Sequence, residues 1–191
     1  VQTSSSSGSN ASESAGNGLP VFNPYPLMGA SIQTSWPRGF PMHKIKSVKA
    51  GCGLNLNLKE GDIPSATIPL DRVGTIQLLA DHDPDVDGMF RLTQSVPCGS
   101  HDFSFRAPAE GGSKQASLVL SPGTYAPTNA QATLHTYKAL WATLLPMTVH
   151  GRVSDIWRAY FAERLYADLG LSVVFAAPRV DQFRNPHDYL A

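Results

Sequence analysis

Acidic side chains stand on alternate residues in a short run that ends in glycine. Asp81, Asp83, Asp85 and Asp87 all precede Gly88. Carboxylates this close disfavour one another's ionisation unless a cation or a hydroxyl-rich ligand lies among them. The run therefore predicts a loop that binds a metal or a sugar. A solvated acidic turn accounts for the same residues, because Asp, Pro and Gly are common in turns.

A calcium loop is a narrower interpretation of the same run. Residues 83–88 match the opening of an EF-hand loop, but Gln94 stands where that loop requires a bidentate Glu. Helices should flank an EF-hand, whereas residues 89–93 have the composition of an extended segment. We therefore favour a sugar- or metal-facing loop at the end of a strand.

Ionisable residues also gather at the start of the clearest helical pattern, which begins at Ser154. Asp155 in the first turn suits the positive end of a helix, and it could act as a general base if its surroundings raise its pKa. Arg152 and Arg158 could clamp a phosphate or diphosphate through paired hydrogen bonds. A plain helix start with an acidic first turn and surface arginines is the alternative.

Two further groups of residues could contact a ligand. Trp36 and Arg38 lie in a Trp-Pro-Arg-Gly-Phe-Pro segment, where a rigid ring beside a guanidinium suits stacking on a base or sugar. The same ring could instead fill a corner of the core. Arg184 and His187 follow the last expected strand and could orient a ligand or bind a metal, although histidines in loops are more often structural or solvated.

The expected elements indicate an α/β fold with a mixed sheet and flanking helices. Apolar residues at helical spacing predict a helix that starts with Ser154 as its N-cap and ends at Gly170, and residues 171–176 read as a buried strand. Residues 116–120 and 131–134 are strand candidates. Residues 136–145 are a helical stretch that Pro146 ends.

Composition places limits on the function. The chain has 191 residues, with 15 basic and 15 acidic side chains and 42% hydrophobic residues, which fits a single domain with a real core. Without a basic stripe or a long apolar run we expect no binding to nucleic acid and no membrane contact by this segment. Cys52 and Cys98 do not form a metal-type pair, and a disulfide between them is left open.

Two parts of the chain have little apolar content. Residues 1–18 are rich in Ser and Gly, so we expect a flexible linker or loop there, with Asn10 in a glycosylation sequon. Residues 108–115 form a second low-complexity insertion. By contrast, residues 19–41 are rich in proline and aromatic residues and should be irregular, packing through their rings.

Several segments, taken in order, resemble the STELLO family of glycosyltransferase-like proteins, which is best known from the plant Golgi. The matching segments cover roughly residues 20–191: Asn-Pro-Tyr-Pro at 23–26, Trp-Pro-Arg-Gly-Phe-Pro at 36–41, Pro-Asp-Val-Asp at 84–87, residues 131–146, Ser-Asp-Ile-Trp-Arg and its continuation at 154–165, and residues 182–189. The order is also similar, more distantly, to the UDP-arabinopyranose mutases, or reversibly glycosylated polypeptides.

Both resemblances imply a GT-A fold, which binds nucleotide-diphosphate sugars. By position, Asp155 would match the acid that contacts the acceptor hydroxyl, with Ser154 in place of the acid that often precedes it. Asp85 and Asp87 would line the sugar or acceptor side of the cleft, so we expect the acids near residues 85 and 155 to converge on a shared pocket. The acidic triplet that binds Mn²⁺ or Mg²⁺ lies upstream of these segments in relatives. We therefore expect residues 19–191 to be the acceptor-side portion of such a domain, within a longer protein.

The resemblance also implies a function. It predicts transfer of a sugar from a nucleotide-diphosphate donor to an acceptor hydroxyl, with a divalent metal in the complete domain. The expected partners are a nucleotide sugar and a carbohydrate acceptor, and the expected location is the Golgi lumen within a membrane-anchored parent protein. The alternative is a non-catalytic scaffold that assists the assembly of polysaccharide synthase complexes. A calcium-binding surface module is a third hypothesis.

Overall fold

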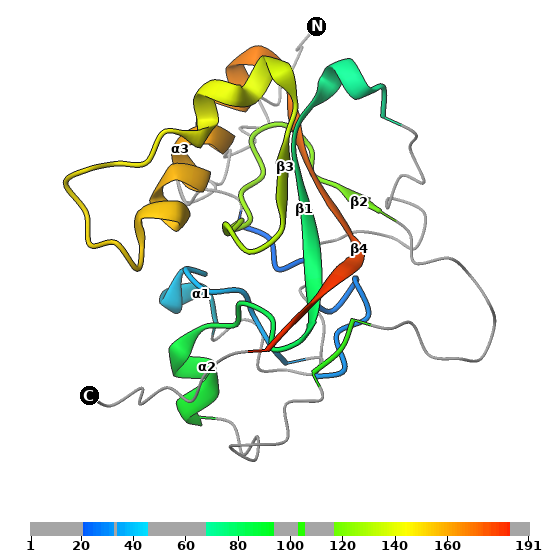
Figure 1. Cartoon of the computed structure of the whole chain (residues 1–191), viewed down its shortest axis with the longest axis vertical. Coiled ribbons are helices and arrows are strands. Elements are labelled where there is room, and N and C mark those ends of the chain that lie inside the picture. Colours follow the sequence, from blue (N-terminus) through cyan, green and yellow to red (C-terminus); the bar gives the residue numbers. More distant parts are fainter. Residues whose placement is uncertain (1–20, 33, 46–67, 94–102, 106–116, 184–191) are drawn as a thin grey trace, which may run out of the picture.

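A mixed four-stranded sheet forms the centre of the molecule (Figure 1). The computed structural model describes residues 21–32, 34–45, 68–93, 103–105 and 117–183. The strand order is β2-β4-β1-β3. The two central strands, β1 (Val73–His82) and β4 (Ser172–Gln182), are parallel, and the short edge strands β2 (Leu118–Val119) and β3 (Thr133–His135) are antiparallel to their neighbours. The predicted α/β class with a mixed sheet is confirmed.

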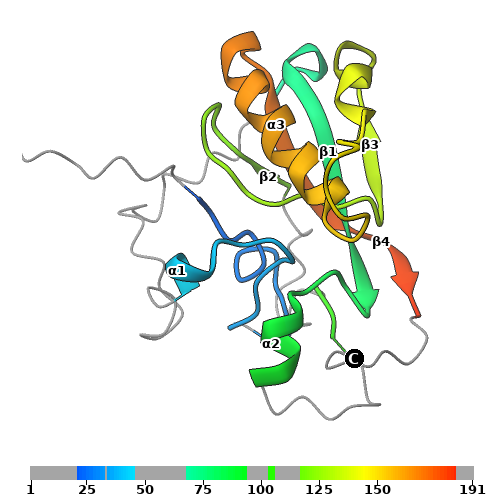
Figure 2. The same cartoon turned by 90° about the vertical axis from the view of Figure 1, so that its left-hand side faces the viewer.

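One long helix covers a face of this sheet. Helix α3 (Ser154–Leu169) crosses the sheet with its first turn toward the end where β1 finishes (Figure 2). The 3-10 helix η3 (Tyr137–Thr143) packs against α3 and β3. A shorter 3-10 turn, η2 (Leu70–Arg72), leads into β1. Helix α2 (Gly88–Thr93) follows the end of β1, and α1 (Met42–Ile45) lies to one side of the sheet (Figure 1).

The central strand β1 ends in the acidic run, where a strand was expected, but its residue range was not predicted from the sequence. Two of its buried residues, Thr75 and Gln77, are polar and interrupt the apolar pattern. Both find partners inside the protein, as buried polar groups must. The Thr75 hydroxyl lies 2.7 Å from the Tyr166 hydroxyl, and the Gln77 side-chain oxygen accepts a hydrogen bond from the Asn129 amide at 2.8 Å.

Helix α3 ends as predicted, but its N-cap lies one residue before the expected one. Gly170 takes the left-handed conformation, with φ 64°, that ends many helices. Val153 is the N-cap, and Ser154 is the first helical residue, whose hydroxyl donates to the Gly151 carbonyl at 2.9 Å. The expectation that Ser154 caps the helix is therefore wrong.

One expectation about the neighbouring segments is confirmed and another is wrong. The helical stretch expected at residues 136–145 is a 3-10 helix over Tyr137–Thr143. Residues 89–93, expected to be extended, belong to helix α2. The Asp87 carboxylate accepts a hydrogen bond from the Met89 amide at 2.9 Å, so the last acid of the run stabilises the start of this helix.

The aromatic segment near the start of the chain packs through its rings, as predicted. Phe22, Tyr25, Trp36 and Phe40 are all buried in the core cluster. The Tyr25 hydroxyl donates to the carbonyl of Asp85 at 3.1 Å. This irregular segment therefore lies directly against the acidic run.

Helix α3 also places one acid inside the core. Glu163 is 4% exposed, and one of its carboxyl oxygens accepts a hydrogen bond from the Ala126 amide at 3.1 Å. Among the described residues the other oxygen has no hydrogen-bond partner. Burial therefore raises the pKa of Glu163 well above its ordinary value, against the smaller opposing effect of the Ala126 amide.

Replacing Glu163 with glutamine should make the protein more stable in mildly alkaline solution. The raised pKa in the folded state contributes stability that is fully present below the ordinary pKa of 4.5. This contribution is lost as the pH rises through the pKa of the folded state. E163Q cannot lose a proton, so its advantage should grow with pH and reach the order of 1 kcal/mol. Urea unfolding at pH 5 and pH 8 measures this difference. Equal gains at both pH values would contradict the prediction.

Several expectations lie outside the described residues. They concern the linker at 1–18 with its sequon at Asn10, the insertion at 108–115, the cysteines Cys52 and Cys98, and the ligand contacts assigned to Arg184 and His187. Within the described ranges, no helix has the length and apolar character that a membrane span requires.

Candidate functional site

Arginines pair with two of the four acids of the run, which begins at Asp81 near the end of β1. Asp83 pairs with Arg91, whose guanidinium also donates to the Pro84 carbonyl at 2.9 Å. Asp85 pairs with Arg38 at 2.8 Å. Two guanidinium groups thus supply the positive charge for which a metal was expected, and the repulsion between the carboxylates is relieved without one.

The other two acids of the run bind backbone amides. Asp81 accepts a hydrogen bond from the Phe105 amide at 2.8 Å, and Asp87 accepts one from the Gly39 amide at 3.3 Å. No group of three His, Cys, Asp or Glu side chains in the described ranges could hold a metal ion. Because β1 precedes the run, the helix-loop-helix geometry of an EF-hand is also absent there.

The segment at residues 36–41 brings Arg38 to this run. The Arg38 amide donates to the Asp85 carbonyl at 3.0 Å, and the Asp87 amide donates to the Trp36 carbonyl at 3.3 Å. Gly39 has φ 84°, and a Cβ atom there would lie 2.3 Å from Cγ2 of Ile156 on α3. Glycine is therefore required for this segment to contact both the acidic run and the start of α3.

Arg38 joins the two acidic stretches that were expected to share a pocket. Its Nη2 atom lies 2.8 Å from the Asp85 carboxylate and 2.7 Å from the Asp155 carboxylate. We call this arrangement the Arg38 bridge. Burial alone would lower the pKa of Arg38, but the hydrogen bonds and charges of the two aspartates outweigh it and raise the pKa.

Asp155 is held in its ionised form. Burial would raise its pKa, but the hydrogen bonds and charge of Arg38 and the amides of Ala130 and Ile156 lower the pKa below its ordinary value. The raised pKa on which a role as general base depends is therefore not found. The Asp155 carboxylate is instead suited to accept a hydrogen bond from a ligand hydroxyl.

A cavity of about 660 Å³ lies over the Arg38 bridge. Its lining includes four arginines, Arg38, Arg91, Arg152 and Arg158, against two aspartates, Asp85 and Asp155. We call it the basic pocket. It lies beyond the carboxyl end of β1, next to the parallel strand β4, which is where open α/β sheets bind ligands.

Two of these arginines are not neutralised. Within the described part of the chain, no carboxylate pairs with Arg152 or Arg158. The charge of Arg158 reaches His135 on β3, whose pKa is lowered by burial first and then by this arginine. Unpaired guanidinium groups in a pocket are suited to bind phosphate oxygens.

The structure brings together most of the residues singled out from the sequence. Five of them line the basic pocket: Arg38, Asp85, Arg152, Asp155 and Arg158. Asp87 lines a neighbouring groove. Trp36 is 6% exposed, and its ring centroid lies 5.1 Å from that of Phe90 in an edge-to-face contact. The structure therefore supports packing of Trp36 in the core over stacking on a ligand. A buried ring offers no face on which a substrate could stack.

Sequence reasoning missed Arg91 and Gln131, which also line the pocket. Arg91 lies on α2, soon after the acidic run, and pairs with Asp83. Predicting a helix at residues 88–93 would have placed Arg91 beside the acidic run. Gln131 donates to the Asp83 carbonyl at 3.3 Å, a contact for which the sequence offers no signal.

Comparison with known proteins identifies two relatives. No family model matches the chain. Probable glycosyltransferase STELLO1 from Arabidopsis thaliana is 26% identical over 173 residues, and probable glycosyltransferase STELLO2 from the same plant is 25% identical over 173 residues. Each match covers 88% of this chain, which spans about 20% of the length of either relative. The resemblance expected from the sequence is thereby confirmed, and the chain is STELLO-like over most of its length.

Proposed function

We propose that this chain is the acceptor-side portion of a glycosyltransferase domain of GT-A type and that the basic pocket is where transfer takes place. The observation that carries the proposal is the convergence of Asp85 and Asp155 on Arg38 beside two unpaired arginines. The names of both relatives support the class of reaction. Nucleotide sugar and carbohydrate acceptor are the substrates we propose.

Each side of the pocket has a distinct part in this proposal. Arg152 and Arg158 bind the diphosphate of the donor, because paired N–H groups match phosphate oxygens and stabilise the charge that develops as the diphosphate leaves. Asp155 orients the acceptor hydroxyl. The acceptor oxygen bonds to the anomeric carbon of the donor sugar, the bond to the diphosphate breaks, and the hydroxyl proton passes to an oxygen of the departing diphosphate while Asp155 holds the hydroxyl in place by a hydrogen bond.

A divalent metal enters the proposal only for a complete domain. The four acids of the run are engaged by arginines and backbone amides, so this donor set does not fit Mn²⁺ or Mg²⁺. Such an ion would take its ligands from elsewhere in the domain. A location in the Golgi lumen within a membrane-anchored parent protein remains part of the proposal and is supported by the resemblance alone.

Asp155→Asn in the full-length protein should reduce sugar transfer at least a hundredfold, because the acceptor hydroxyl loses its charged partner. Asp85 remains on Arg38, so the fold should be kept, with a loss of about 1 kcal/mol. Transfer is measured with radiolabelled nucleotide sugars, and stability by thermal unfolding. Wild-type turnover by the variant would remove Asp155 from the reaction.

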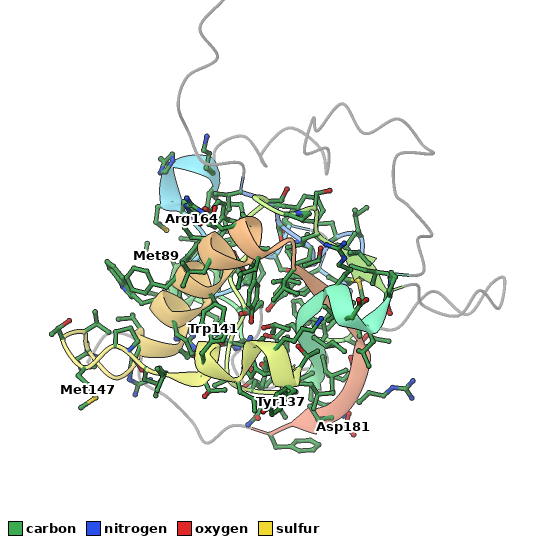
Figure 3. All side chains as sticks on the ribbon, turned by 90° about the horizontal axis from the view of Figure 1, so that it is seen from above. Met89, Tyr137, Trp141, Met147, Arg164 and Asp181 are labelled. Carbon is green, nitrogen blue, oxygen red and sulfur yellow. The ribbon has the colours of Figure 1, made fainter. Side chains whose placement is uncertain are left out.

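The scaffold hypothesis also has an observation in its favour. Apolar side chains are strongly exposed around η3 and the loop after it, where Met147 is 92% exposed and points outward (Figure 3). Exposed apolar surface of this kind marks sites of protein association. A full-length protein that transfers no sugar but still binds a polysaccharide synthase complex through this surface would favour the scaffold over the enzyme.

A further inference from the structure

A second cavity lies beside the basic pocket and shares Arg38 with it. Its volume is about 640 Å³, and four aromatic residues line it: Tyr125, Trp157, Tyr160 and Phe161. We call it the aromatic groove. Three of these rings come from the first two turns of α3, immediately after Asp155. The groove and the proposed transfer site therefore adjoin at Arg38 and form one continuous region.

Two of the four rings are unusually accessible to solvent, whereas Tyr125 is buried. Trp157 is 49% exposed and Phe161 is 55% exposed. The two rings lie 5.8 Å apart between centroids at an angle of 49°, and Tyr125 and Tyr160 stack at 6.2 Å. These neighbouring contacts limit how far the rings can turn, so the groove presents preformed aromatic faces.

Polar groups border these rings. Arg38 and Asp87 lie toward the basic pocket, and Arg164 lies farther along α3 (Figure 3). Beneath the rings the Tyr160 hydroxyl donates to the Gly39 carbonyl at 3.1 Å, which fixes its ring against the segment that holds Arg38. A ligand for this groove must therefore combine apolar faces with a polar edge.

A pyranose ring has this combination, with C–H groups on its faces and hydroxyls at its edge. We propose that the aromatic groove binds the carbohydrate acceptor, with successive sugar rings stacked on Phe161 and Trp157 and the terminal hydroxyl reaching Asp155. This inference rests on the proposed function and extends it by assigning an acceptor of more than one sugar unit. The charged side chains at the edge of the groove, Arg38, Asp87 and Arg164, suit the hydroxyl groups of a saccharide better than a purely apolar partner.

Saccharide binding to the full 191-residue chain tests the proposal. The probes are cellotetraose, maltotetraose, mannotetraose and xylotetraose, titrated by isothermal calorimetry and by tryptophan fluorescence, to which Trp157 contributes with Trp36 and Trp141. We expect at least one tetrasaccharide to bind and to shift the emission. Trp157→Leu and Phe161→Leu keep the groove apolar but remove a ring, so each should weaken that binding about tenfold, which corresponds to about 1.4 kcal/mol.

Matched controls separate stacking from general apolar contact. Leu165→Ala, one turn beyond the groove on the same helix, and Trp141→Phe on η3 should leave tetrasaccharide affinity unchanged. Equal affinity in wild type and Phe161→Leu would overturn the inference, as would an absence of binding by all four probes. A dimer in sedimentation experiments that Phe161→Asp dissociates would assign the groove to self-association instead.

Failure here is distinguishable from failure of the proposed function. Uridine diphosphate binding depends on Arg152 and Arg158, whereas tetrasaccharide binding depends on Trp157 and Phe161. Diphosphate binding without saccharide binding overturns only the acceptor groove. Saccharide binding that the ring substitutions weaken, without diphosphate binding, supports the groove and counts against the transfer site.

Discussion

Replacing Gly39 with alanine should destabilise the protein by roughly 4 kcal/mol, because two penalties act at one residue. The residue has φ 84°, and its new Cβ atom would lie 2.3 Å from Cγ2 of Ile156. Relief requires the Trp-Pro-Arg-Gly-Phe-Pro segment to move away from α3, which also pulls Arg38 from Asp155. Urea unfolding measures the loss of stability.

Gly123→Ala is a matched control for this substitution. Gly123 has nearly the same φ, 85°, but its Cβ would meet nothing within 4 Å. Its substitution should therefore cost only the backbone strain, about 1–2 kcal/mol. Ile156→Ala in the Gly39→Ala background should recover part of the remaining loss in a double-mutant cycle. Equal losses for Gly39→Ala and Gly123→Ala would show that the contact with Ile156 does not matter.

Replacing Arg38 with leucine should cost roughly 3 kcal/mol at neutral pH, because it leaves two carboxylates without their partner. The side chains of Asp85 and Asp155 are 5% and 15% exposed, so water replaces the guanidinium poorly. Arg38→Lys keeps the charge but cannot bind both carboxylates with a planar fork, and it should lose about half as much. Chemical unfolding of both variants gives the two values.

The cost of Arg38→Leu should also depend on pH. Arg38 lowers the folded-state pKa of Asp155, so this contribution to stability is present above the ordinary value of 3.8 and is lost as the pH falls through the folded value. The difference between wild type and Arg38→Leu should therefore be largest near pH 7 and shrink below pH 4. A difference that stays constant down to pH 3 would assign the loss to packing.

Sequence reasoning located the last part of the fold best. Helix α3 and strand β4 combine helical periodicity, a glycine end signal and a continuous apolar run, and all three signals point the same way. The bounds of strand β1 were not predicted, because its buried polar residues Thr75 and Gln77 interrupt the apolar pattern and find their partners on other elements. Tertiary partners of this kind leave no periodic trace in the sequence.

The candidate site was predictable in its members but not in its electrostatics. Asp85 and Asp155 were expected to converge, and the structure places both on Arg38. A run of alternating aspartates has the same sequence pattern whether a metal or arginines neutralise it. The direction of the pKa shift at Asp155 depends on an arginine 117 positions away, so local composition alone could not determine it.

The Arg38 bridge has a consequence for the order in which the protein assembles. Its two ion pairs span 47 and 117 positions of the chain, so each closes a long loop before any energy is gained. Contacts of such high sequence separation slow folding. The walls of the basic pocket should therefore meet late, after α3 has formed and together with the parallel pairing of β1 and β4, whose partners Val73 and Ser172 lie 99 positions apart. A nascent chain would acquire its ligand-binding region only in the final steps.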